Sequence, residues 1–261
     1  MIRLTVLTEN TVSCDGLTPE HGVSFYIETP HHRILFDMGQ SDLFVRHAQQ
    51  LGVDLAAVDV AVLSHGHYDH GGGLSYFLQQ NDRARIFVNA HAFEPHYRAD
   101  GSDIGLDPRL QTHPRVIPVR DQLELDGELS LFSCNDRPCF HGIDTAGLCM
   151  AHMAPEDFRH EQYLQIHDAG RRILVSGCSH KGILNIVEWF TPDVLVGGMH
   201  LNKYATTGAE SAALAQIARQ LAATTTRYYT CHCTGLAQYA FLQTHLGEKI
   251  SYLAAGATVT I

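Results

Sequence analysis

Residues 61–74 read AVLSHGHYDHGGGL, so an apolar run is followed by three histidines and an aspartate within six positions, and then by three glycines. A continuous apolar run of this kind is typical of a strand that is covered on both faces. The polar side chains are therefore expected in the loop at the carboxyl end of a buried strand. The glycines at positions 71–73 allow backbone to pass close to that loop and lead into a helix.

The spacing of these polar side chains indicates a metal site. His65 and His67 share one face of the chain, because alternate residues of an extended segment point the same way, so we predict that they bind one ion. Asp69 and His70 follow a turn, and we predict that they face a second ion beside the first. Imidazole and carboxylate ligands favour zinc, with iron or manganese as alternatives, so two divalent ions are expected.

The composition narrows the class of protein. The chain has 261 residues and a net charge of −10, which argues against binding nucleic acid by neutralising phosphates. Eighteen histidines equal all lysines and arginines together, and histidine is the commonest metal ligand. Seven cysteines form no spaced disulfide framework, and no apolar run reaches the roughly 20 residues that span a bilayer. We therefore expect a cytoplasmic protein with free thiols and no membrane partner.

The order of the elements predicts an α/β (α+β) fold in one domain, residues 1–261. Each half of the chain is rich in strands and carries helices, which suits two packed mixed sheets with helices on both outer faces. Loop insertions are expected at 91–120 and 134–160. Predicted strands lie near residues 2–10, 23–30, 32–39, 58–65, 84–90, 193–201 and 226–235, with one final strand at 250–261, and hairpins are predicted at 123–134 and 161–178.

The opening motif resembles the His-x-His-x-Asp-His motif of the metallo-β-lactamase fold superfamily, and the likeness covers most of the chain. RILFDMG resembles that family's early strand, which implies that Asp37 lies beneath the metal loop and accepts an N–H from a ligand histidine. RRILVSGC resembles the strand that ends in a metal-bridging aspartate in most members, although here the residue is Cys178. YYTCHC resembles the late strand that delivers the last ligand, His232. The resemblance implies a four-layer αββα sandwich.

A narrower resemblance is to dihydropterin or ribofuranosylaminobenzene-phosphate synthase-like metallohydrolases. It is carried by EHGVSFYIE, ILFDMGQ, SHGHYDHGGGL, GCSHKGI, GGMH and CHCTG. The branch motifs are specific, but the branch name is a weak guide to the reaction.

One ligand of the first metal is left open by the sequence. His180 ends the same strand as Cys178 and is favoured, whereas His160 in RHEQ is the alternative and would otherwise face the substrate. Strand alternation points Cys231 and Cys233 away from His232, so both are expected in the core. The predicted metal ligands are His65, His67, Asp69, His70, Cys178, His180 and His232.

Two adjacent divalent ions can lower the pKa of a shared water toward neutrality. The sequence therefore predicts a dinuclear metal-dependent hydrolase that uses a metal-bound hydroxide on a small ester or phosphoester. Asp69 and His200 are the predicted catalytic residues, and His21 and His160 are the predicted substrate-binding residues. The alternatives are a metal-dependent synthase or transferase of pterin-type metabolism, and a non-catalytic ligand-binding member of the fold.

The insertions carry cations that could meet an anionic small-molecule substrate, and a homo-oligomer is compatible with the sequence. These cations are Arg98, Arg109, Arg115, Arg137 and Arg159.

Overall fold

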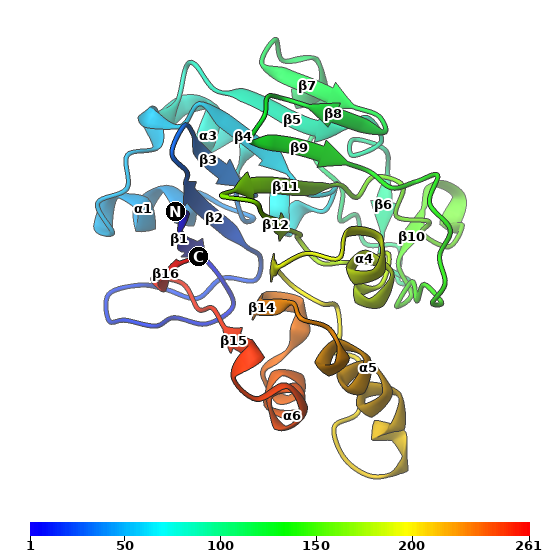
Figure 1. Cartoon of the computed structure of the whole chain (residues 1–261). Coiled ribbons are helices and arrows are strands. Elements are labelled where there is room, and N and C mark those ends of the chain that lie inside the picture. The colour runs from blue at the N-terminus through cyan, green and yellow to red at the C-terminus, as the bar shows by residue number, and fades with distance from the viewer.

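Two seven-stranded sheets form the centre of the computed structural model, which describes residues 1–261 (Figure 1). The first sheet has the order β16 (Thr258–Thr260), β1 (Arg3–Thr8), β2 (Ser24–Glu28), β3 (Arg33–Phe36), β4 (Val60–Leu63), β5 (Arg85–Asn89) and β7 (Val116–Val119). The second has the order β15 (Ile250–Tyr252), β14 (Arg227–Thr230), β13 (Val194–Val196), β12 (Arg171–Val175), β11 (Tyr163–Asp168), β9 (Leu129–Phe132) and β8 (Gln122–Glu124). A small pair joins β6 (His96–Tyr97) to β10 (Cys149–Met150).

The sheets pack face to face, and helices cover their outer faces. One apolar core, including Phe25, Phe36, Leu131 and Leu164, lies between the sheets. A second core joins the first sheet to helices α1 (Leu43–Gln50) and α3 (Leu74–Gln80). A third joins the second sheet to α4 (Ile183–Phe190), α5 (Ala212–Ala223) and α6 (Leu236–Leu246). The predicted four-layer αββα architecture is confirmed, and none of its helices is long and apolar enough to span a bilayer.

The carboxyl ends of the parallel strands lie at the same edge of each sheet. β3, β4 and β5 are parallel, and β1 runs the same way because two antiparallel pairings separate it from β3. In the second sheet, β12, β13 and β14 are also parallel. The two edges meet, since the backbone N–H of His232 after β14 donates to Glu9 Oε1 after β1 at 2.6 Å. Residues far apart in the chain therefore share one site.

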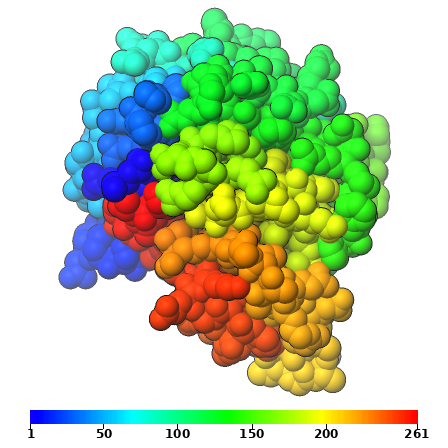
Figure 2. Space-filling view, in the orientation of Figure 1, coloured from blue at the N-terminus to red at the C-terminus, as the bar shows by residue number.

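Two predictions about the strands were wrong. Part of the predicted insertion at 91–120 is β7, a parallel edge strand of the first sheet. Its sequence, VIPV, is short and contains Pro118, which an edge strand tolerates because its missing N–H faces no partner. The predicted final strand is two strands in different sheets: β15 pairs with β14, and β16 pairs with β1. Figure 2 shows the C-terminal end of the chain against its N-terminal strands.

Two histidines outside the predicted site have structural roles. His47 is buried, with Nδ1 2.7 Å from the carbonyl oxygen of Leu7 and Nε2 accepting from the backbone N–H of Thr18. His32 is half-buried and lies 3.0 Å from Asp59 and 2.7 Å from Asp126. Asp126 belongs to the β8–β9 turn, so His32 ties the β2–β3 turn of the first sheet to the second sheet.

We predict that His32 makes stability depend on pH. Burial alone would lower the pKa of His32, but the hydrogen bonds with Asp59 and Asp126 raise it above its ordinary value. Its stabilisation is therefore fully present below about pH 6.5 and is lost as the pH rises through the raised folded-state pKa. The melting-temperature difference between wild type and His32→Gln should shrink between pH 6 and pH 8.

Exposed His31 is the matched control, since His31→Gln should show no such trend. A wild-type to His32→Gln difference that stays constant with pH would contradict the assignment.

Candidate metal centre

The buried carboxylate of Asp37 organises the loop that carries the histidine motif. It follows β3 and is fully buried. It accepts hydrogen bonds from the backbone N–H and the Oγ–H of Ser64, both at 2.7 Å. His70 Nδ1 lies 2.7 Å from the same carboxylate, so it donates its proton there. His70 Nε2 is thereby left as the free nitrogen, which is the support for a ligand histidine expected of Asp37.

The first cluster contains three imidazoles whose rings converge. The ring centroids of His65, His67 and His180 lie 4.6, 4.8 and 5.0 Å apart in the three pairings. Ser64 Oγ donates to Asp37 and therefore accepts from His65 Nδ1 at 2.8 Å, which leaves the lone pair on His65 Nε2. His65 Nε2 and both ring nitrogens of His180 are buried without a partner. This cluster presents the nitrogen lone pairs that a divalent ion requires.

The second cluster surrounds Asp69. Its Oδ2 lies 3.2 Å from Nε2 of His232, 3.2 Å from Nε2 of His21 and 3.6 Å from Nε2 of His70. The thiol of Cys178 lies 3.2 Å from His70 Nε2. Ligand atoms of His70, Cys178 and His232 lie within 4.8 Å of one another, as do those of His21, Asp69 and His232. The second cluster can therefore supply imidazole, thiolate and carboxylate ligands.

The two clusters are neighbours, because the rings of His65 and His70 are 4.1 Å apart. Cys178 belongs to both, since its thiol also lies within 4.8 Å of ligand atoms of His65 and His180. Cys178 thus takes the position between the clusters that a bridging residue would occupy.

The pKa values separate the two clusters electrostatically. Burial, reinforced by neighbouring imidazoles, holds the pKa of His65 well below its usual range. Burial likewise lowers the pKa of His67 to about 3, against a weaker opposing effect of Asp69. Burial would also lower the pKa of His70, but Asp69 and Asp37 outweigh it and raise that pKa to about 9. The first cluster thus presents neutral imidazoles, whereas Asp69 and Asp37 favour positive charge at His70.

The structure bears on the choice between His180 and His160. His160 is fully buried, and its Nδ1 accepts the backbone N–H of Gly66 at 2.9 Å. A backbone N–H can only donate, so the lone pair of His160 is occupied and its proton is on Nε2. His160 lies 5.8 and 5.1 Å, ring to ring, from His65 and His67, farther than His180. These bonds favour His180 as the third imidazole of the first cluster.

Two of the remaining predicted site residues lie at one pocket of about 150 Å³ at the strand ends. His21 and His200 line it, and the ring of His200 packs edge-on against His180 at 4.4 Å. Burial and Lys203 lower the pKa of His200 to about 4, so it faces the pocket as a neutral imidazole. His160 does not line the pocket.

The two cysteines beside His232 are both buried but lie in different surroundings. Cys231 packs in the core between the sheets, as expected. Cys233 is also buried, as expected, and lies at the wall of the pocket with its thiol 3.5 Å from the carbonyl oxygen of Cys178. Residues His232–Thr234 form a short 3-10 helix, in which strand alternation no longer applies.

Several residues that position the site escaped sequence reasoning. Glu9 accepts the backbone N–H of His232, and Glu161 accepts that of His180 at 2.7 Å. Asn10 Oδ1 accepts from the backbone N–H of Gly22 and lies 2.7 Å from His232 Nδ1, so that nitrogen donates and His232 Nε2 is free. For Glu9 and Asn10 the available signal was their position directly after a strand, at the edge where the motif lies.

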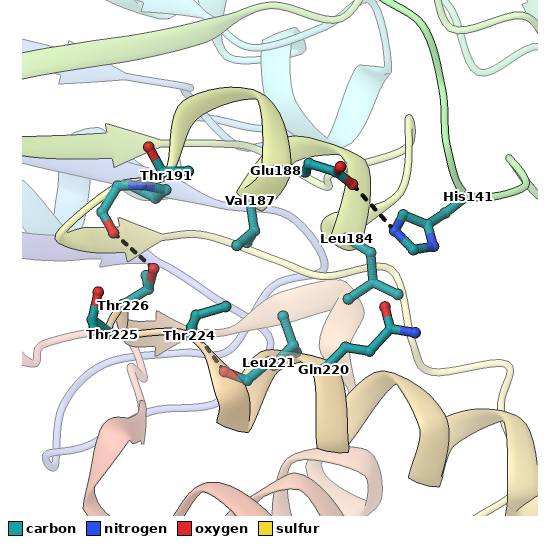
Figure 3. A pocket seen from close by; sticks show the side chains of 11 residues that line it. His141, Leu184, Val187, Glu188, Thr191, Gln220, Leu221, Thr224, Thr225 and Thr226 are labelled. Atoms are coloured by element: carbon teal, nitrogen blue, oxygen red, sulfur yellow. Dashed lines mark hydrogen bonds and ion pairs between the residues drawn. The ribbon is translucent and has the colours of Figure 1, made fainter.

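A larger pocket of about 380 Å³ lies elsewhere, between α4, α5 and the start of β14 (Figure 3). It holds one ion pair, between His141 and Glu188 at 3.5 Å, and several threonines. None of the predicted metal ligands lines it. The smaller pocket at the strand ends is therefore the candidate site.

The donor set fits divalent metal ions. Buried histidine nitrogens normally find a hydrogen-bond partner, yet His65 and His180 present unpartnered nitrogens toward a common point. The residues that would hold the ions are His65, His67 and His180 at one position and Asp69, His70, Cys178 and His232 at the other.

We predict that His180 rather than His160 is a ligand. His180→Ala should reduce the metal content from two ions per chain to one, measured by mass spectrometry of the elements after desalting. His160→Gln should retain both ions, because the glutamine amide can accept from Gly66 and still donate to Glu156. The opposite pattern, with one ion lost in His160→Gln and two kept in His180→Ala, would reverse the assignment.

The chain resembles known proteins in sequence and in structure. Residues 17–134 match the family model of the metallo-beta-lactamase superfamily. The chain is 28% identical over 208 residues to the uncharacterized protein MJ0448 of Methanocaldococcus jannaschii, covering 76% of this chain and 79% of that protein. It is 29% identical over 192 residues to the 7,8-dihydropterin-6-methyl-4-(beta-D-ribofuranosyl)-aminobenzene-5'-phosphate synthase of the same organism, covering 65% of this chain and 64% of the synthase.

Among solved structures, Tm1679, a metal-dependent hydrolase of the beta-lactamase superfamily, superposes with a TM-score of 0.84 and 26% identity. The superposition covers 100% of this chain and 99% of Tm1679. These matches confirm the resemblance predicted from the motifs: the chain has the metallo-β-lactamase fold, and residues 17–134 match the model of that superfamily.

Proposed function

We propose that the protein is a dinuclear metal-dependent hydrolase that acts on a small anionic ester or phosphoester. The observation that carries the proposal is the pair of adjacent donor clusters, in which seven buried side chains follow strands of both sheets and five of them line one pocket. The likeness to Tm1679, a metal-dependent hydrolase, supports the reaction class.

The bound ions would supply Lewis acidity and a water of lowered pKa, which is the chemistry that ester and phosphoester hydrolysis needs at neutral pH. Asp69 would orient that water and accept its proton, because its carboxylate lies at the pocket between His21 and His232. Neutral His200 would donate a hydrogen bond to the oxygen on which negative charge develops. His21, half-exposed at the mouth, would contact the substrate.

Arg98 supports an anionic substrate. Four arginines of the predicted pocket walls are already engaged: Arg109 with Asp107, Arg159 with Glu94, Arg115 with Asn81, and Arg137 with the carbonyl of Trp189. Arg98 lines the pocket, and its guanidinium makes one hydrogen bond, to the hydroxyl of Tyr68 at 3.2 Å, with no carboxylate within ion-pair distance. A carboxylate or phosphate on the substrate would complete its pairing.

The second candidate is a synthase of pterin-type metabolism, favoured by the likeness to the aminobenzene-phosphate synthase. Such an enzyme would use the same ions to activate one organic substrate toward another. The test is a screen of phosphodiesters, thioesters and lactones in ¹⁸O-labelled water, because hydrolysis places one solvent oxygen in the product and condensation joins two substrates. Condensation without label would overturn the proposed hydrolysis.

We predict that the Asp69 carboxylate is required for turnover. Asp69→Asn keeps the shape of the side chain but removes the charge that accepts a proton, so kcat should fall at least ~100-fold. Steady-state kinetics of the metal-loaded variant would measure this. Exposed Asp82 is the matched control, and Asp82→Asn should leave kcat unchanged. Full turnover in Asp69→Asn would exclude the proposed role.

We also predict that Arg98 binds the substrate anion. Arg98→Met should raise KM about tenfold or more for anionic substrates with little change in kcat, because one charge-assisted hydrogen bond is lost. Arg109→Met, which removes an arginine already paired with Asp107, is the control and should change neither constant. An equal loss with uncharged substrates would show that Arg98 does not read charge.

A further inference from the structure

A groove between α4 and α5 leads away from the pocket at the strand ends. α4 begins close to that pocket, because its N-cap Gly182 lies two residues after His180. The two helices with their C-caps line the groove with Leu184, Val187, Glu188 and Thr191 from α4 and Ile217, Gln220, Leu221 and Thr224 from α5. Each set has the spacing i, i+3, i+4 and i+7, so one face of each helix is turned toward the groove.

Three pockets follow one another along this groove. The middle pocket, of about 70 Å³, shares His180 and His200 with the strand-end pocket of about 150 Å³. It shares His141 and Leu184 with the outer pocket of about 380 Å³. These two pairs of residues form the constrictions between the pockets. Because a helix rises about 1.5 Å per residue, the path along α4 from Leu184 to Thr191 is about 10 Å long.

A loop that is fixed to α4 forms one wall of the groove. Asn185 of α4 accepts the backbone N–H of His141 at 2.8 Å and donates to the carbonyl oxygen of His141 at 2.9 Å. Asp144 and Lys203, which both line the middle pocket, form an ion pair at 2.9 Å. The loop is thus held at two points by contacts within the protein, so the groove is formed before a ligand binds.

The outer pocket combines an apolar wall with free hydrogen-bonding groups. Val187 and Leu221 line it and are buried, and Figure 3 shows them on facing helices. The side-chain amide of Gln220 makes no hydrogen bond with the other residues drawn there. No lysine or arginine lines this pocket, and its carboxylate, Glu188, lies 3.5 Å from His141. A phosphate or carboxylate would therefore meet no strong cation, whereas an uncharged polar group would find partners.

We propose that the groove between α4 and α5 binds the distal part of the substrate, an uncharged group with an apolar face and hydrogen-bonding edges. The inference deepens the proposed function and rests on it, since the ester or phosphoester would lie at the metal centre. The groove is assigned to the substrate because His180 and His200 wall both its inner end and the candidate site. Recognition is then divided: Arg98 meets the anion in the strand-end pocket, and Gln220 and Leu221 meet the neutral group.

The first test compares short and long substrates of the metal-loaded wild type. The short probes are 4-nitrophenyl acetate and methyl 4-nitrophenyl phosphate. The long probes carry a 6-benzamidohexanoyl group in place of acetyl, or a 6-benzamidohexyl group in place of methyl. Hydrolysis adds water across the ester or phosphoester bond and releases coloured 4-nitrophenolate. The uncharged benzamide should reach the outer pocket, so kcat/KM should be ~10-fold or more higher for a long probe than for its short partner.

Two variants of α5 locate the effect. Gln220→Trp fills the outer pocket from a half-buried position, so it should lower kcat/KM for the long probes ~10-fold or more and leave the short probes unchanged. Gln216→Trp is the matched control, because Gln216 is exposed on the same helix and lines none of the three pockets. It should keep the preference for the long probes.

The second test needs no turnover. It measures the binding of N-hexylbenzamide, the distal part of the long probes alone, by saturation-transfer NMR. Wild type and Gln216→Trp should bind this fragment, and Gln220→Trp should not.

The outcomes separate the inference from the proposed function. Equal kcat/KM for short and long probes in wild type, or a preference that survives in Gln220→Trp, would overturn the inference and leave the proposed hydrolysis intact. An equal loss of the preference in Gln216→Trp would also overturn it, because the effect would not come from the pocket. Turnover of none of the probes, with N-hexylbenzamide bound by wild type and lost in Gln220→Trp, would count against the proposed hydrolysis and support the outer pocket as a site for a neutral ligand.

Discussion

The buried carboxylate of Asp37 is the constraint from which the site is built. A carboxylate removed from water costs several kcal/mol unless hydrogen bonds and charges replace its hydration. All the hydrogen bonds described for Asp37 come from Ser64 and His70, so the ending of β3 is tied to the ending of β4. Its φ of 58° is a strained conformation for a residue other than glycine, and this bonding holds it. The orientation of His70 is thereby decided within the protein.

Buried carboxylates also hold the other two loops that carry predicted metal ligands. Glu9 accepts the N–H of His232 and also hydrogen bonds from Thr11 and Tyr252. Glu161 accepts the N–H groups of His180 and Lys181. Each buried carboxylate thus holds the backbone of one ligand-bearing loop rather than the ligand ring. A frame of buried carboxylates therefore lies under the site.

The local sequence pattern was enough to predict the architecture, the histidine motif and the position of Asp37. The apolar run before His65 and the Asp-x-Gly sequence after a strand each indicate the end of a buried strand, within a few residues of a predicted site residue. The residues that were missed, such as Glu9, reach a loop of the site only through folding, since Glu9 and His232 are 223 residues apart. β16 was not predicted as a separate strand for a similar reason, because its pairing with β1 joins the two ends of the chain. Cys233 lies at the pocket wall because a 3-10 turn replaces the assumed strand alternation after β14.

Proximity alone would not separate His160 from His180, since both lie close to His67. The two residues differ in whether a hydrogen bond already occupies the lone pair of the imidazole ring. A neutral imidazole has one lone pair, and for His160 it is committed to the backbone N–H of Gly66. His180 has no such commitment, and its ring is instead held by stacking on Phe158 at 4.5 Å and by Glu161 through its own backbone. Packing orients His180 without occupying its nitrogens, whereas hydrogen bonding orients His160 by occupying them. The type of contact that orients each ring is therefore the basis for predicting His180 as a ligand and His160 as a support.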